Sequence, residues 1–228
     1  MDIIFVLWLL GPLVIGYLSG SIQNGIMIGK IFFKKDVRDF GSHNAGGTNV
    51  GRVFGKKIGL LCIILDIIKT FAPMIIFFFV YRYYVKPMYE EISYYNFIDE
   101  YAYSLAAFGA TLGHCYPCFY SFKGGKAVSA FGGICLFTSW LNAAVGFSIF
   151  LIVLKLKKYV SLASMIGSSC VAISSIIMIF THFGTNFNIH NYILYAVLMS
   201  VLALILIIRH RANIIRLIRK EESKIKWM

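Results

Sequence analysis

The run AVSAFGGICLFTSWLNAAVGFSIFLIVL, residues 127–154, decides how this chain can fold. Lysines lie at both of its ends, with Lys123 and Lys126 before it and three more within residues 155–158. Because basic residues mark the cytoplasmic ends of membrane segments, the run should enter and leave the membrane on the same side. As one helix it would extend about 42 Å, at about 1.5 Å per residue, which is too short for two full crossings. We therefore predict two short helices with a break near residues 140–142.

Five further apolar runs have the length that a membrane span requires, since about 20 helical residues cross about 30 Å of hydrocarbon. They are residues 3–22, 58–80, 101–122, 160–181 and 192–208. A chain that is 59% hydrophobic, with a mean hydropathy of +0.76, cannot bury all its apolar surface in one soluble core. The first run lacks the basic start of a cleaved signal, and we expect it to be a membrane helix. We predict an all-α membrane bundle of about seven helices, two of them short, in a single domain over residues 1–228.

Charge gives the expected orientation of these helices. Residues 29–57 and the tail from Arg209 each hold seven lysines and arginines. Residues 81–100 hold two basic and four acidic side chains, and residues 183–191 hold neither sign. The positive-inside rule then predicts the N-terminus outside and the C-terminus in the cytoplasm. Because the net charge of +12 gathers at membrane boundaries, it indicates anionic headgroups and substrates, and nucleic acid is not an expected partner.

The segment DFGSHNAGGTNVGR, residues 39–52, is the first candidate site. Its glycines let backbone N–H groups turn inward around an anion, and Arg52 adds a planar, permanently charged fork. The alternative is a solvated loop whose glycines serve only its turns. Candidate substrate-binding residues here are Gly41, Asn44, Gly46, Gly47, Thr48 and Asn49, and candidate catalytic residues are Ser42 and Arg52.

Lys123-Gly124-Gly125-Lys126 is the second candidate element, because it puts two cations around two flexible residues just before a predicted helix. It is not a Walker motif, since the spacing differs and no serine or threonine follows the second lysine. The alternative is a pair of lysines that merely flank a membrane segment. We take Lys123 as catalytic and Gly124, Gly125 and Lys126 as substrate-binding.

The third element follows the last apolar run, where His210 and Asn213 are spaced to share one helical face. Both are candidate catalytic residues, with His210 either a general base or an orienting group. Ser161 and Ser164 repeat the spacing of three at the start of another predicted helix. They are predicted to bind substrate phosphate or to cap that helix.

Buried polar residues complete the inventory. Asp66 and Lys69 share a face inside a predicted span and should neutralise each other, because charges in a membrane are costly unless paired. His114 is expected to pack between helices or to support the site. Cys115 and Cys118 form a solitary CxxC without a second ligand pair, so we predict neither a disulfide nor a metal site.

Several of these segments together resemble the PlsY-type family of bacterial membrane acyltransferases. The matching motifs are GSI-x-x-G-x-x-I-G-K (residues 20–30), GSHNAGGTNVGR (41–52), GH-x-x-P-x-F-x-x-FKGGK-x-V (113–128) and RHR-x-NI-x-R (209–216). The family usually has proline where Ala45 stands and alanine where Gly47 stands, and often proline at Gln23. These departures remove no charged or hydroxyl group.

The resemblance implies the transfer of a fatty acyl group from acyl phosphate to glycerol 3-phosphate, which gives lysophosphatidic acid and phosphate. It also implies a place in the bacterial cytoplasmic membrane, contact with membrane lipid, an active site on the cytoplasmic side, and no cofactor or obligate protein partner. The alternative is a transporter or channel for a phosphorylated metabolite. A transporter should carry polar groups near the membrane midplane, where only Asp66 and Lys69 are expected, so the sequence favours the enzyme.

Overall fold

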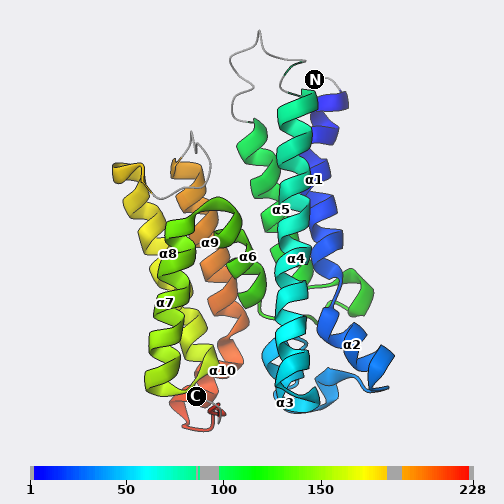
Figure 1. The fold of residues 1–228 in the computed structure, drawn as a ribbon, viewed down its shortest axis with the longest axis vertical. Coiled ribbons are helices and arrows are strands. Elements are labelled where there is room, and N and C mark those ends of the chain that lie inside the picture. Colours follow the sequence, from blue (N-terminus) through cyan, green and yellow to red (C-terminus); the bar gives the residue numbers. More distant parts are fainter. Residues whose placement is uncertain (1–2, 86, 88–97, 184–191, 226–228) are drawn as a thin grey trace. The chain divides into compact units, whose positions relative to one another are not determined.

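The computed structural model describes residues 3–85, 87, 98–183 and 192–225, and these residues form helices joined by short connections (Figure 1). The predicted all-α class is confirmed. Internal contacts divide the chain into two compact units, Met1–Ile134 and Cys135–Met228, which we describe one at a time. A single domain over residues 1–228 stays a prediction.

The first unit is built on two long helices that touch along glycines. Its elements are α1 (Ile3–Ser21), α2 (Asn24–Phe32), the 3-10 turn η1 (Val37–Asp39), α3 (Gly47–Phe54), α4 (Lys56–Val80), the π turn η2 (Tyr81–Val85), α5 (Ile98–Cys115), the 3-10 turn η5 (Cys118–Tyr120) and most of α6 (Val128–Thr138). A methyl group on Gly16 of α1 would lie 2.2 Å from the Ala106 carbonyl oxygen of α5, and one on Gly113 would lie 2.1 Å from that of Tyr17. Small residues at these positions therefore let α1 and α5 pack backbone to backbone, as membrane helices commonly do.

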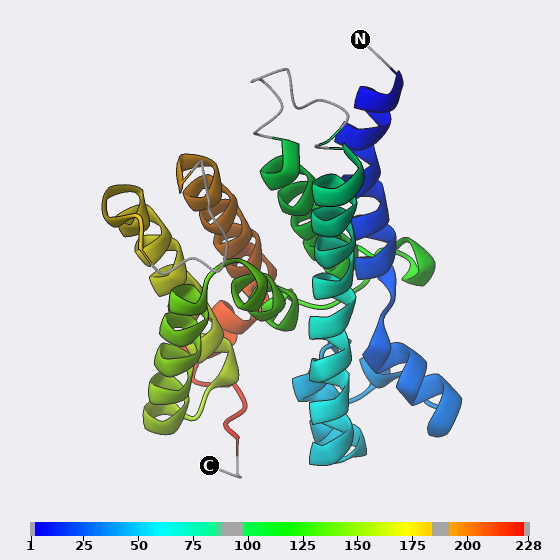
Figure 2. The same cartoon turned by 45° about the horizontal axis from the view of Figure 1, so that its top comes forward.

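The second unit contains α7 (Trp140–Lys157), α8 (Val160–Thr181), α9 (Tyr192–Arg209) and α10 (Arg211–Ile218), and α7, α8 and α9 can be followed in Figure 2. A buried polar cluster joins its long helices, because the Asn142 side chain donates hydrogen bonds of 2.7 Å to both Ser175 and Tyr195. Satisfied polar groups of this kind fix one arrangement of apolar helices.

The predicted break in residues 127–154 is confirmed, and it falls at Ser139, between α6 and α7. The backbone of Ser139 is extended, and its side chain accepts a hydrogen bond from the Asn142 N–H, which caps the start of α7. The prediction that both helices are short was wrong for α7. This helix continues through its terminal lysines to a length of 18 residues, whereas α6 has 11.

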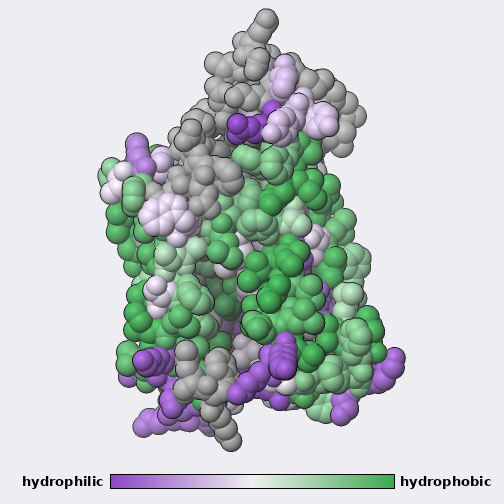
Figure 3. Space-filling view, viewed as in Figure 1, coloured by the Kyte–Doolittle hydropathy of each residue, from purple (hydrophilic) through white to green (hydrophobic). Residues whose placement is uncertain are grey.

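Within the described residues, four helical segments are long and apolar enough to cross a membrane: Lys56–Val85, Trp140–Lys157, Val160–Thr181 and Tyr192–Arg209. Val128–Thr138 is a shorter apolar helix. Large apolar side chains such as Leu60 and Ile68 on α4 face outward, and Figure 3 shows apolar residues over the helices of each unit. Such surfaces are stable against lipid and not against water.

The predicted span over residues 101–122 is shorter than expected. Helix α5 ends at Cys115, and the chain continues into the η5 turn. Pro117 explains this end, because a proline disfavours helical backbone at the residue before it.

Candidate functional site

The glycine-bearing segment is partly a helix, which corrects its description as a loop. Gly46 has an extended backbone and precedes α3, whose first residue is Gly47, so Thr48, Asn49 and Arg52 lie on α3. The Arg52 side chain is exposed, and Ser42, Asn44 and Thr48 are half-buried. The start of α3 presents backbone N–H groups, which favour an anion.

Gly47 serves packing between helices in addition to any role at the site. A methyl group there would lie 2.5 Å from Cγ1 of Ile63 and 2.8 Å from the Gly59 carbonyl oxygen, both on α4. Gly47 thus lies in a close contact between α3 and α4.

Asn49 holds the segment in shape from within. Its side-chain nitrogen donates hydrogen bonds to the carbonyl oxygens of Val37, Phe40 and Asn44 at 3.0, 3.0 and 2.9 Å. Its side-chain oxygen accepts a hydrogen bond of 2.7 Å from the Ser42 N–H. The side chain is buried, so its observed contacts are those that shape the loop, and a direct contact with substrate stays a prediction.

Gly41 occupies the one turn of this segment where glycine is needed for its backbone. Its φ is +62°, and a methyl group there would lie 2.4 Å from the Asn49 side-chain oxygen. An L-residue at this position would be strained and would also displace Asn49.

Arg38 ties the first candidate element to the second, and sequence reasoning missed it. Its guanidinium donates to both carboxylate oxygens of Asp36, at 3.0 and 2.8 Å. Its third contact point, Nη1, donates to the carbonyl oxygens of Tyr120 and Lys123, each at 3.2 Å. The Arg38 hydrogen bond lowers the pKa of Asp36, against a smaller opposing effect of burial, so this carboxylate stays charged.

The second candidate element, residues 123–126, is a short loop that packs on the buried residue His114. Its glycines are buried, the Lys123 side chain is exposed and that of Lys126 is half-buried. The Gly125 N–H donates a hydrogen bond of 2.9 Å to the His114 carbonyl oxygen. The Arg38 carbonyl oxygen also lies 3.0 Å from Nδ1 of His43 in the glycine-bearing segment. Because Arg38 contacts both elements, the structure brings this loop and the glycine-bearing segment together in the first unit.

In the second unit, Glu222 accepts hydrogen bonds from residues of the third element and from Ser161 on α8. Its Oε1 accepts hydrogen bonds of 2.7 Å from Ser161 and from the Asn213 side chain, and its Oε2 accepts one of 2.7 Å from Arg216. Burial alone would raise the pKa of Glu222, but the hydrogen bonds from Ser161, Arg216 and Asn213 outweigh it and lower the pKa.

The capping role suggested for Ser161 and Ser164 is wrong. Helix α8 begins after Tyr159, which makes no side-chain capping hydrogen bond. Both serines lie within the helix: Ser161 donates to Glu222, and Ser164 donates to the Val160 carbonyl oxygen at 2.8 Å. Phosphate binding by either serine stays a prediction.

His210 lies at a break between helices, not at the end of a continuous one. Helix α9 ends at Arg209, and His210 precedes α10, which contains Asn213. His210 is buried, and its Nδ1 lies 2.8 Å from the Leu206 carbonyl oxygen. A carbonyl only accepts, so Nδ1 carries the hydrogen, and the unprotonated nitrogen of a neutral ring is Nε2.

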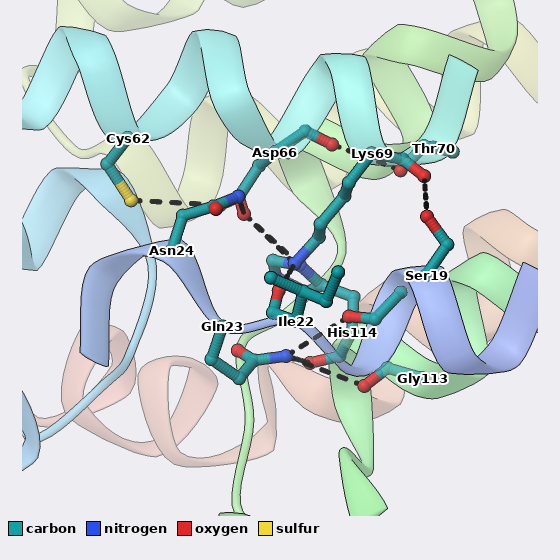
Figure 4. A network of polar contacts seen from close by, with 11 residues as sticks. Ser19, Ile22, Gln23, Asn24, Cys62, Asp66, Lys69, Thr70, Gly113 and His114 are labelled. Carbon is teal, nitrogen blue, oxygen red and sulfur yellow. Dashed lines mark hydrogen bonds and ion pairs between the residues drawn. The ribbon is translucent and has the colours of Figure 1, made fainter. Parts of the chain in front are cut away.

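The expected pairing of Asp66 with Lys69 is confirmed. Lys69 Nζ lies 3.0 Å from Asp66 Oδ1, and both side chains are buried. Figure 4 shows further contacts of the pair: Asn24 donates to Asp66 at 2.9 Å, and Lys69 donates to the Ile22 carbonyl oxygen at 2.6 Å. The charges are thus shared with polar groups at the connection between α1 and α2.

Cys115 and Cys118 both carry free thiols. Within the described ranges, three or more histidine, cysteine or acidic side chains nowhere gather into a group that could hold a metal ion. That the CxxC has no part in the chemistry stays a prediction.

Two acidic residues were missed, although each carried a signal in the sequence. Asp36 lies among basic residues immediately before the glycine-bearing segment, and Glu222 is one of two carboxylates in a basic tail. An isolated acid in such surroundings is expected to pair with a nearby cation.

The fold defines the class of the protein as a helical, multi-pass integral membrane protein, and its candidate anion-binding elements lie at helix ends. Residues 10–220 match the family described as glycerol-3-phosphate acyltransferase. The chain belongs to this family.

Similar proteins cover nearly the whole chain. It is 41% identical over 215 residues to the glycerol-3-phosphate acyltransferase of Listeria monocytogenes serotype 4a (strain HCC23), which covers 94% of this chain and 95% of the relative. It is 42% identical over 218 residues to the protein of the same description from Staphylococcus aureus (strain Newman), with coverage of 95% and 97%.

Solved structures show the same fold. The crystal structure of PlsY (YgiH), an integral membrane glycerol 3-phosphate acyltransferase, in its glycerol 3-phosphate form matches with a TM-score of 0.75 and 31% identity over 95% of each chain. Its lysophosphatidic acid form matches with a TM-score of 0.73 and 30% identity, over 95% of this chain and 94% of that one. The prediction of a membrane glycerol-3-phosphate acyltransferase is therefore confirmed, over the transporter that the sequence left open.

Proposed function

We propose that the chain transfers a fatty acyl group from acyl phosphate to glycerol 3-phosphate, with release of lysophosphatidic acid and phosphate. Membership in the glycerol-3-phosphate acyltransferase family over residues 10–220 is the observation that carries this proposal. The similarity to PlsY in its glycerol 3-phosphate and lysophosphatidic acid forms supports the same substrate and product here.

The chemistry needs little more than alignment and charge stabilisation. A hydroxyl oxygen of glycerol 3-phosphate attacks the acyl carbonyl carbon, the bond from that carbon to the phosphate oxygen breaks, and phosphate leaves with the electron pair. The donor is already activated, so the enzyme has to hold two anions in line and stabilise the departing charge.

In the first unit, we assign phosphate binding to exposed cationic side chains on segments whose backbone is held by hydrogen bonds. Arg52 offers a guanidinium fork from α3, and Lys123 offers an ammonium group from the loop that Arg38 holds. Ser42 and the backbone around Gly41, Gly46, Gly124 and Gly125 would complete these contacts.

In the second unit, we assign the handling of the glycerol hydroxyls to His210 and Asn213. Protonation of Nδ1 leaves His210 Nε2 able to accept a hydrogen bond from a hydroxyl. Glu222 fixes the Asn213 side chain, and fixed groups bind a substrate with a smaller entropic cost.

For the membrane topology, we propose seven membrane helices, α1 and α4 to α9, with the C-terminus and the active site in the cytoplasm. The distribution of lysine and arginine supports this orientation, and α6 is the short helix that makes the count odd. Membrane lipid surrounds the apolar surfaces, and the location is the bacterial cytoplasmic membrane.

The direct test is acyl transfer by the purified protein in detergent. Labelled glycerol 3-phosphate and acyl phosphate should yield labelled lysophosphatidic acid and one equivalent of phosphate. Acyl-CoA in place of acyl phosphate is the control donor. Transfer from acyl-CoA alone would reject the proposed donor, and no transfer from either would reject the proposed reaction.

A further inference from the structure

We propose that His114 is a positioning residue for the loop at residues 123–126, through which the buried Asp66–Lys69 pair sets where the loop presents its lysines to substrate phosphate. The inference rests on the proposed function of that loop. It assigns a role to a buried network that the proposed reaction does not otherwise use.

His114 contacts the loop through both its backbone and its ring. Its carbonyl oxygen accepts a hydrogen bond of 2.9 Å from the Gly125 N–H. A methyl group on Gly125 would lie 2.0 Å from His114 Nε2, 2.8 Å from Cδ2 and 3.0 Å from Cε1. The imidazole is therefore the surface on which Gly125 rests, and only glycine allows that approach.

The other side of the ring faces the ion pair. His114 Nδ1 lies 4.0 Å from Asp66 Oδ1. The same oxygen pairs with Lys69 Nζ and accepts a hydrogen bond from the Asn24 side chain. The Gln23 side chain donates to the carbonyl oxygens of His114 and Gly113, at 3.2 and 3.5 Å (Figure 4). The ring of His114 thus faces a buried carboxylate of α4, and its backbone is held by the buried Gln23 side chain from the connection between α1 and α2.

This support matters because the loop has little stiffness of its own. Two adjacent glycines allow many backbone conformations, and fixing each of them in one conformation costs conformational entropy. A loop already held against a buried ring binds its ligand without that cost. A loop that loses the ring should bind phosphate more weakly, while the chemical step on bound substrate changes less.

The test disrupts the contact between Gly125 and His114 with one substitution and relieves the resulting clash with a second. Gly125→Ala should displace the ring and raise the KM for the phosphate substrate that the loop holds by about tenfold or more. His114→Asn keeps a polar group towards Asp66 but has no atoms where Nε2 and Cε1 lie. The asparagine keeps one atom near Cδ2, 2.8 Å from the methyl position, but this atom ends a short side chain and can shift. In the double variant, the nearest contact of the alanine methyl is therefore gone, and the KM should fall from that of Gly125→Ala to about that of His114→Asn alone.

Gly124→Ala is the matched control. A methyl group on Gly124 would lie 2.2 Å from the His114 carbonyl oxygen and 2.6 Å from Cδ of Pro117, and His114→Asn moves neither atom. His114→Asn should therefore leave the defect of Gly124→Ala in place. Recovery of both glycine variants alike would mean a general effect of the histidine substitution and would overturn the proposal.

Kinetics for both substrates and thermal unfolding in detergent should be measured for wild type, the three single variants and the two double variants. Selective recovery of KM for Gly125→Ala supports positioning, and independent effects of the two substitutions overturn it. If Gly125→Ala does not fold, His114→Asn alone decides, because positioning predicts a higher KM at nearly constant kcat. Unchanged kinetics in a folded His114→Asn protein would reject the role.

The proposed function is judged separately, by turnover of the wild type. If the wild type shows no turnover, the reaction is rejected, and calorimetric binding of glycerol 3-phosphate and inorganic phosphate to the same proteins replaces KM. Selective recovery of affinity would then still support His114, and its absence would still reject it.

Discussion

The side-chain amide of Asn213 donates a hydrogen bond of 2.7 Å to Oε1 of Glu222. The same carboxylate receives Ser161 from α8 and Arg216 from α10. One acidic residue therefore joins the end of the chain to two helices and fixes the orientation of a candidate catalytic amide.

Glu222→Gln should destabilise the protein and lower its affinity for glycerol 3-phosphate. The glutamine amide would turn a donor towards groups that already donate, and a lost charge-assisted hydrogen bond costs about 1.5–3 kcal/mol. The thermal midpoint should fall, and the KM for glycerol 3-phosphate should rise. Glu221→Gln is the control, because Glu221 is adjacent to Glu222 in the chain and its side chain is exposed. Equal behaviour of the two variants would contradict a specific role for Glu222.

The same carboxylate predicts a dependence of stability on pH. The pKa of Glu222 is lowered in the folded protein, so its stabilising contribution is complete above the unfolded pKa of about 4.3. That contribution is lost as the pH falls through the lower folded value. The thermal midpoint, measured at a series of pH values from 7 downward, should begin to decrease once the pH is below about 4.3. Glu222→Gln should lack this part of the drop.

The orientation of α6 and α7 can be tested by accessibility. Ser121 and Lys157 lie exposed on either side of this helix pair, and both should be cytoplasmic if the pair returns to its starting side. In an otherwise cysteine-free protein, single cysteines at these positions should resist an impermeant thiol reagent until the cells are opened. Phe183→Cys, beyond the other end of α8, should react in intact cells. Labelling of Ser121→Cys and Lys157→Cys from opposite sides would reject the seven-helix topology.

The long elements could be predicted because apolar length and flanking charge act locally. The break at Ser139 follows from the charges around residues 127–154 and lies one residue before the predicted position. Helices α3 and α10 could not be predicted in this way, because each has only eight residues and depends on packing for its stability.

The candidate site was predictable in its exposed cations and not in its supports. Arg52 and Lys123 stand out as charges beside glycines. Asn49 also stood out, but its hydrogen bonds to four backbone groups depend on how residues 37–44 fold back. Arg38 acts across a separation of 85 positions to Lys123, which no local pattern reports.

Arg52 should be essential for affinity through its geometry as well as its charge. Arg52→Ala should lower kcat/KM about ten- to a hundredfold, the effect of losing one charge-assisted contact. Arg52→Lys should recover little of this loss, because lysine keeps the charge without the bidentate fork. Lys57→Ala, an exposed cation at the start of α4, is the control for a general loss of charge. Wild-type kinetics in folded Arg52→Ala protein would refute the assignment.

His210 decides how the attacking hydroxyl loses its proton. If Nε2 is the general base, His210→Ala should lower kcat about a hundred- to ten-thousandfold and remove an acidic limb from the pH–rate profile. If the phosphate oxygens of the donor take the proton, His210 only orients the glycerol, and its loss should mainly raise the KM for glycerol 3-phosphate.

We expect the second result, because an activated donor needs little help from a base. The hydrogen bond from Nδ1 to Leu206 suits either role, since it fixes the ring and leaves Nε2 as an acceptor. His210→Gln places an amide near the position of Nε2 and cannot act as a base. It should therefore recover much of the affinity that His210→Ala loses, with the acidic limb unchanged. A fall in kcat of several hundredfold in both variants, at constant KM, would instead make His210 the base.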